Sequence, residues 1–331
     1  MLGFRSIFAF LIILSGAVLL VLFILLPETQ RHIAGNGSVP LRGIDKPLIY
    51  RLGGQPHVSP PELETNKRQK LRWRSIVQPL TWLNQRDILC LLGFGGAVYT
   101  AQSMVTASLA GVLAKRYHLE VLEVGLCFLP TGLGTIIGGQ FKGWIMNRDM
   151  DRAQTDYRRQ HDVAGEQTLN VSDHPDFPLE RVRLRWMPYI ITIFIASIAA
   201  YGFSLSTHIG VAFFLQFIMG ASSAAVLNIN TTYVTDLFPN RSASAVGLQN
   251  LVRCVMGAGG VAGVNPIMNK LGNRLAFLLV ACFVLGFAPL QWIGMRLGPK
   301  CRKRRHIERE SKTAKASETV MAGCDKADTE T

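Results

Sequence analysis

The run from Ile7 to Leu26 reads IFAFLIILSGAVLLVLFILL and contains no charged residue. A helix needs roughly 20 mostly apolar residues to cross a hydrocarbon core of about 30 Å. The run therefore predicts a membrane-spanning helix. We expect this helix to stay in the protein, because Leu26-Pro27-Glu28-Thr29 lacks the small residues of a signal-peptide cleavage site.

Six later stretches have a similar length and composition, so we expect seven spans. Only 17% of the 331 residues are charged, against roughly a quarter in a soluble domain. The predicted fold class is therefore all-α, a polytopic membrane helix bundle. The six stretches are approximately Ile88–Ala110, Val121–Trp144, Met187–Ser206, Ile209–Thr231, Ala243–Val264 and Leu275–Met295.

The cationic residues predict the orientation of the bundle. Ten Lys and Arg lie between Pro27 and Arg86 and eight between Lys142 and Arg185, whereas the intervening connectors carry few. Positive residues collect on the cytosolic side, so we expect the N-terminus outside and the long loops and C-terminus in the cytosol. The same placement accounts for the net charge of +13 without a nucleic-acid partner.

These patterns divide the chain into four parts. Residues 1–27 form a single transmembrane helix and residues 28–86 a cytosolic central loop. Residues 87–297 form a six-helix bundle with a cytosolic loop at 145–185, in which 149–160 is a short helix. Residues 298–331 form a basic, disordered cytosolic tail.

The chain shows no arrangement of catalytic groups. The spans contain no pair of carboxylates and no Ser/His/Asp set, and the histidines nearest each other in the loops, His161 and His174, lack ligand spacing. The glycine runs lie in lipid-length helices, which argues against a dinucleotide site. We therefore expect no enzyme activity, no cofactor and no metal.

Polar residues inside the spans are the candidate functional groups, because hydrocarbon offers them no water. Gln216 and Asn230 share a face of the fifth span with Gly220 and Ser223. We expect this face either to line a cavity or to meet another helix. Tyr99 and Gln102 share a face of the second span with the same two alternatives.

The sixth span carries Gln249, Asn250 and Arg253. A mid-membrane arginine costs roughly 2.5–3.5 kcal/mol on insertion scales. We expect Arg253 either to act in substrate passage or gating, or to bond structurally to carbonyls or to a carboxylate such as Asp236. Glycine clusters in several spans, including Gly134 and Gly138, predict close helix packing.

Several strings together resemble the major facilitator superfamily, and within it the twelve-span fungal drug:proton antiporters of the quinidine- and multidrug-resistance branch. The resemblance covers roughly residues 4–300. It is carried by LPETQR at 26–31, VGLCFLPTGLG at 124–134, GWIMNRD at 143–149, YVTDLFP at 233–239 and NLVRC at 250–254.

The resemblance implies that the first span corresponds to the family's sixth helix and the later six to its C-terminal half. Five helices would then be absent, and a second, N-terminal half would be a partner of this one. We expect either the C-terminal portion of a longer transporter or a truncated remnant that does not transport. A seven-helix receptor is disfavoured, because its first cytosolic loop is short and the corresponding loop here has about sixty residues.

The resemblance also implies an activity, export of small organic compounds across the plasma membrane in exchange for protons. Substrate would lie between the two halves, where Tyr99, Gln102, Gln216, Asn230, Gln249 and Asn250 are candidates for its cavity. The string from Gly143 to Asp149 is similar to the family's Gly-x-x-x-Asp-Arg gating motif. Asn147 replaces the acid before Arg148, and Asp149 or Asp151 could substitute for it. With these residues, Arg253 and Asp236 complete the gating and coupling candidates.

Overall fold

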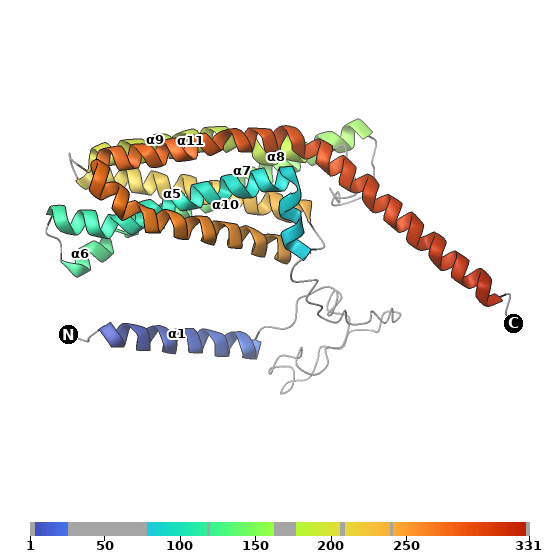
Figure 1. Ribbon diagram of the computed structural model, residues 1–331, viewed down its shortest axis with the longest axis horizontal. Helices are drawn as coiled ribbons and strands as arrows, with labels where there is room; N and C mark the ends of the chain where they lie inside the picture. Colours follow the sequence, from blue (N-terminus) through green and yellow to red (C-terminus); the bar gives the residue numbers. More distant parts are fainter. Residues whose placement is uncertain are drawn as a thin grey trace. The chain divides into compact units, whose positions relative to one another are not determined.

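A computed structural model describes residues 4–25, 78–117, 120–161, 177–205, 209–238 and 241–328 (Figure 1). The chain divides into two compact units, Met1–Trp73 and Arg74–Thr331. The described part of the first unit is α1 (Phe4–Leu25), whose apolar side chains are exposed along its length. Most of the predicted central loop, 28–86, lies outside the described residues.

The second unit is a helical bundle, and no strand occurs in its described ranges. Its elements are η2 (Gln78–Asn84, a 3-10 helix), α5 (Arg86–Tyr117), α6 (Val121–Leu126), α7 (Leu129–His161), α8 (Leu179–Leu184), α9 (Met187–Ser204), α10 (Ile209–Leu237) and α11 (Ser242–Asp328). The predicted fold class, an all-α membrane bundle, is confirmed.

Helix α11 contains two of the predicted spans. Gly272 has φ 74° and ψ 167°, a region that essentially only glycine occupies. The chain reverses there, and Figure 1 shows the orange first part and the redder second part running in opposite directions. Six described helices, α1 included, are long and apolar enough to cross a membrane. The reversal in α11 brings the membrane-length segments to seven.

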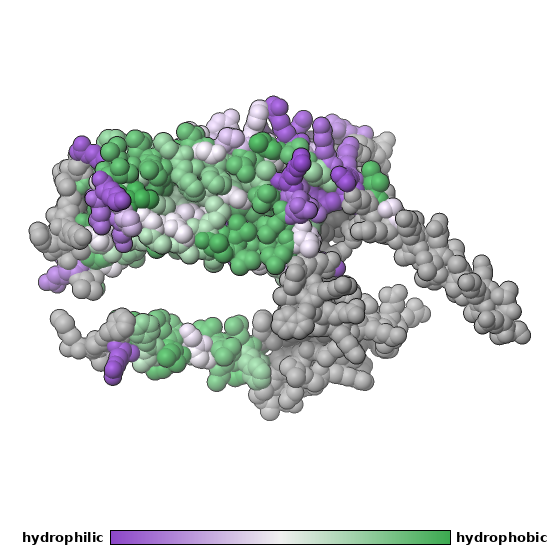
Figure 2. All heavy atoms as spheres, in the orientation of Figure 1, coloured by the Kyte–Doolittle hydropathy of each residue, from purple (hydrophilic) through white to green (hydrophobic). Residues whose placement is uncertain are grey.

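Helix α10 lies at the centre of the bundle and packs on α5, α7, α9 and α11. Glycine permits the closest approaches, as expected. A Cβ at Gly134 would collide with the backbone of Phe217, and one at Gly138 with the backbone of Ala221. On the outside, apolar side chains such as Ile136 and Val255 are exposed. Figure 2 shows hydrophobic residues along the middle of the visible face of the bundle and hydrophilic groups toward its two ends.

The predicted span Val121–Trp144 differs from the structure at both ends. It is interrupted between α6 and α7, at Cys127 and Phe128. Pro130 has no N–H to donate, and a proline ring collides with the carbonyl four residues earlier. At the other end, α7 continues without a break to His161, so residues 149–160 are not a separate helix. No Gly or Pro lies between 145 and 161 to end it.

The predicted disorder of the tail also differs from the structure. Helix α11 continues past Pro299 to Asp328. The sequence after Pro299 has no further proline and is rich in Ala, Glu, Lys and Arg, which are strong helix formers. Helix propensity therefore outweighs the polarity on which the prediction rested.

Candidate functional site

Arg253 is half-buried on the first part of α11 and faces α10. Its Nη2 donates to the Leu227 carbonyl at 3.1 Å and to the Thr231 hydroxyl at 3.2 Å. Its Nε is buried without a hydrogen-bond partner. Of the two expectations for Arg253, the bond to a carbonyl is therefore present. The expected contact between Arg253 and Asp236 is absent; the Asp236 carboxylate pairs with Arg183 at 2.8 Å instead.

Tyr99 and Asn230 lie in the same region, where α5, α10 and α11 meet. A Cβ at Gly257 would lie 2.9 Å from the Tyr99 ring, and one at Gly95 would lie 3.0 Å from the Asn230 side-chain nitrogen. Tyr99 is also within electrostatic range of Arg253. Asn230 is 0% exposed, and both atoms of its amide lack a hydrogen-bond partner. We call Tyr99, Asn230 and Arg253 the polar cluster.

Gln216 belongs to a different contact. It accepts a hydrogen bond from the Thr131 hydroxyl of α7 and donates to the Tyr201 hydroxyl of α9, both at 3.3 Å. Gln216 is 1% exposed, and its two bonds join α7, α9 and α10. For this residue the structure favours the helix-contact alternative.

The remaining cavity candidates differ in burial. Gln102 is half-buried and Gln249 is 2% exposed, and the side-chain oxygen of each is buried without a hydrogen-bond partner. Asn250 is exposed.

The residues of the string at 143–149 lie in the middle of α7, which continues to His161. A Cβ at Gly143 would meet nothing within 4 Å, so this glycine permits no close contact within the described bundle. Asn147 and Arg148 are exposed, and the Arg148 guanidinium lies 5.5 Å from the centre of the Trp144 ring. Asp149 accepts a hydrogen bond from the Trp186 indole at 2.8 Å.

The sequence prediction missed Lys142, which is 9% exposed. Its Nζ donates to the Thr232 hydroxyl of α10 at 3.2 Å. Its charge was assigned to the following loop, because the apolar stretch ends two residues later. Lys142 lies four residues after Gly138, and residues four apart share a helix face. Because Gly138 faces α10, this spacing could have indicated that Lys142 faces α10 as well.

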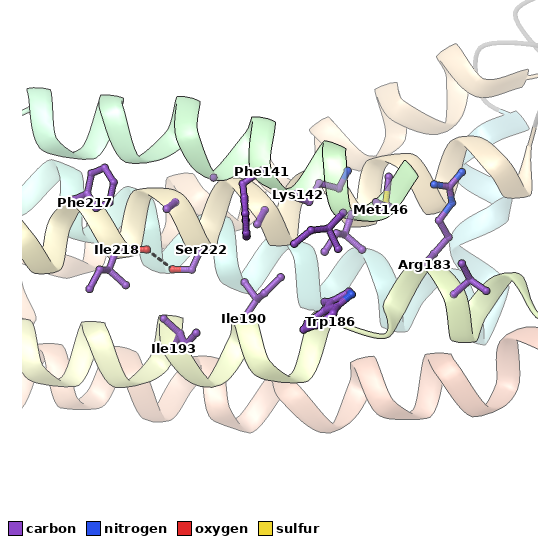
Figure 3. Close-up of a pocket in the computed structure, with 16 residues that line it drawn as sticks. Phe141, Lys142, Met146, Arg183, Trp186, Ile190, Ile193, Phe217, Ile218 and Ser222 are labelled. Atoms are coloured by element: carbon purple, nitrogen blue, oxygen red, sulfur yellow. Dashed lines mark hydrogen bonds between the residues drawn. The ribbon is translucent and has the colours of Figure 1, made fainter. Parts of the chain in front are cut away.

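Lys142 and Arg183 border a groove of about 450 Å³ between α7 and α9, with α10 as its floor (Figure 3). None of the predicted cavity residues lines it. No cluster of three potential metal ligands occurs among the residues with described positions.

Comparison with known proteins identifies relatives of this chain. The family model described as Major Facilitator Superfamily matches residues 1–261. Citrate exporter 1 of Aspergillus niger is 42% identical over 311 residues, which are 94% of this chain and 59% of the relative.

Two further relatives carry names of the drug-resistance type. Multidrug transporter QDR2 of Candida glabrata is 33% identical over 77% of this chain and 47% of its own length. Quinidine resistance protein 1 of Saccharomyces cerevisiae is 31% identical over 83% of this chain and 53% of its own length. The chain thus spans between about half and three fifths of the length of these relatives.

Proposed function

The chain belongs to the major facilitator superfamily, and from that premise we propose that it contributes the polar cluster to the substrate pathway of an exporter of small organic compounds. The observation that carries this proposal is the state of Arg253. A guanidinium half-buried in a membrane-length helix, bonded to a carbonyl and a hydroxyl, has no carboxylate partner in the described ranges. Ionisable groups held inside membrane segments are costly and usually mark pathways.

The first candidate substrate is an organic acid anion. A guanidinium binds carboxylates through parallel N–H groups, and Arg253 is the formal charge of the polar cluster. Asn230 adds an amide that can donate and accept. The relative at 42% identity is named a citrate exporter, which supports a small carboxylate as the cargo.

The second candidate is a drug-like compound. Relatives named for quinidine and multidrug resistance match 77–83% of this chain at 31–33% identity. The Tyr99 ring in the polar cluster could stack on an aromatic compound. For either cargo, we propose exchange for protons across the plasma membrane, as the resemblance implies.

The test uses a chimera, in which this chain replaces the matching 311-residue region of the Aspergillus niger citrate exporter. Yeast cells carrying the chimera are loaded with labelled citrate, and efflux is normalised to the amount of chimera in the plasma membrane. We expect Arg253→Gln to lower efflux at least about tenfold, which corresponds to ~1.4 kcal/mol. Arg253→Lys keeps the charge and should retain part of the efflux.

The matched control is Lys270→Gln, which removes an exposed cation of the same helix and should leave efflux unchanged. Unchanged efflux in Arg253→Gln would reject the proposed role of the arginine. Cells are also grown on quinidine and assayed after collapse of the proton gradient. Protection from quinidine without citrate efflux would select the second candidate, and efflux that survives collapse would exclude proton exchange.

A further inference from the structure

The groove between α7 and α9 has the form of a site for one elongated, mainly apolar ligand. Both helices pack on α10 but make few contacts with each other, which leaves a space open to the outside of the bundle. Figure 3 shows Phe217, Ile193 and Ile218 toward one end and Arg183 toward the other, with Lys142 between them. We propose that this groove binds an anionic phospholipid, with an acyl chain along the apolar part and the phosphate at Lys142 and Arg183.

The apolar part fits a hydrocarbon chain. Phe141, Ile193 and Phe217 line it, and Phe141 and Ile193 are 62% and 51% exposed. The Ser222 hydroxyl in the wall is already bonded to the Ile218 carbonyl of its own helix. A ligand in this part would contact apolar side chains of α7, α9 and α10 and few hydrogen-bonding groups.

The other end is lined by two cations, Lys142 and Arg183. Arg183 is paired with Asp236 at 2.8 Å. Lys142 has only the neutral Thr232 hydroxyl as its bonded partner among the described residues, although Arg183 and Asp236 lie within electrostatic range. The charged side chains that line the groove are thus both cations, Lys142 and Arg183, and a cationic lining complements a phosphodiester.

The depth of Lys142 matches the level of a lipid headgroup. It lies six residues before Arg148, an exposed residue with which the polar part of α7 begins. A helix rises 1.5 Å per residue, so Lys142 lies about 9 Å from the point where exposed charges replace the apolar sequence. Trp186, which also lines the groove, donates its indole N–H to Asp149. Tryptophan side chains whose indole N–H contacts polar groups are typical of the membrane–water interface.

Other ligands fit less well. An extended peptide would need hydrogen-bond partners along its backbone, and the groove offers polar groups at one end only. A small hydrophilic anion would leave the apolar part empty. The polar cluster lies among α5, α10 and α11, so the lipid would act separately from the proposed cargo.

The proposal is tested with the full chain in phosphatidylcholine nanodiscs. Trp186 is made the sole tryptophan by changing Trp73, Trp82, Trp144 and Trp292 to Phe. Its fluorescence is titrated with phosphatidylglycerol or phosphatidylcholine whose acyl chains carry bromine, a quencher. One cation near the surface contributes about 1 kcal/mol to binding of anionic lipid, so phosphatidylglycerol should quench at about fivefold lower mole fraction.

Four variants separate charge from shape. Lys142→Gln should abolish the preference for phosphatidylglycerol, whereas Lys142→Arg should keep it. Lys300→Gln removes an exposed cation of α11 and should change nothing. Ile193→Tyr fills the groove and should weaken quenching by both lipids. Circular dichroism and gel filtration establish that each variant is folded. Equal quenching by the two lipids, or a preference that survives Lys142→Gln, would overturn the proposal.

Discussion

At the scale of single residues, two amides on α10 illustrate opposite uses of a buried polar group. Gln216 is bonded on both sides, to Thr131 and Tyr201, whereas Asn230 is fully buried with no bonded partner. A satisfied amide stabilises a helix contact, while an unsatisfied one costs free energy. This difference indicates a packing role for Gln216, whereas both polar atoms of the Asn230 amide lack a hydrogen-bond partner in the described structure.

Leucine substitutions test this assignment. Gln216→Leu should lower the free energy of unfolding by about 1–3 kcal/mol, because two hydroxyls lose their partner. Asn230→Leu should leave it unchanged or raise it by up to ~1–3 kcal/mol, because an unsatisfied amide is removed. The measurement is denaturant unfolding in detergent, with the exposed Asn228→Leu as the control. A loss of stability in Asn230→Leu would contradict the assignment.

The same residues show how far the sequence could predict the site. A charge or amide inside an apolar run is visible in one sequence, so Arg253, Gln216 and Asn230 could be selected. Which groups they bond depends on helix rotation, which the sequence leaves open. Lys142 was missed because a single charged residue near the end of an apolar stretch can belong either to the following loop or to the helix bundle.

At the scale of elements, α7 shows that glycines within one helix can have different structural roles. Gly138 lies against the backbone of Ala221 on α10, while Gly143, little more than a turn later, faces open space. The motif resemblance singled out Gly143 for a close contact. Within the described bundle, Gly138 has that role.

Alanine substitutions at the two positions should therefore differ in sign. Gly138→Ala forces α7 away from α10 and should destabilise by about 1–3 kcal/mol. Gly143→Ala adds a Cβ without a collision and should stabilise by up to about 1 kcal/mol, since alanine is the better helix former. Thermal unfolding in detergent compares the pair directly, and equal effects would show that the packing at Gly138 adapts.

The elements themselves were largely predictable, because lipid demands long apolar helices and few other sequences meet that demand. The prediction errors lie in the polar segments that follow the apolar spans. Beyond Trp144 the polar sequence suggested a new helix, yet the chain had no breaker. Tyr157 also packs edge-on against Phe177 with ring centres 5.5 Å apart, a tertiary contact that sequence patterns do not show.

At the scale of the whole bundle, ion pairs connect the second part of α11 to other helices. Arg305 contacts Asp87 of α5 at 2.5 Å, and Arg302 lies 3.6 Å from Glu180 of α8. Asp87 is 5% and Glu180 1% exposed. The basic residues after Pro299 thus do more than follow the positive-inside pattern: they join three helices at one end.

Removal of one partner should loosen this end. Asp87→Asn leaves the Arg305 guanidinium without its counter-charge and should cost about 1–3 kcal/mol. Limited proteolysis after residue 298 should become faster, while the exposed Asp156→Asn on α7 should have no effect. Unchanged proteolysis in Asp87→Asn would indicate that the helical extension is held by other contacts.

The orientation is tested by labelling in intact cells. Arg159→Cys and Glu120→Cys place exposed cysteines at opposite ends of the α6–α7 segment, in a chain whose six native cysteines are replaced by serine. An impermeant maleimide should label position 120 directly and position 159 only after permeabilisation. The reverse pattern would invert the proposed topology.

The reversal at Gly272 leaves almost no slack between the two parts of α11. A single residue makes the turn, so neither part can slide lengthwise or rotate without moving the other. A tilt of one part would therefore carry Arg253, on the first part, together with Arg302 and Arg305, on the second. The bonds of Arg253 to α10 and the ion pairs with Asp87 and Glu180 would then change together.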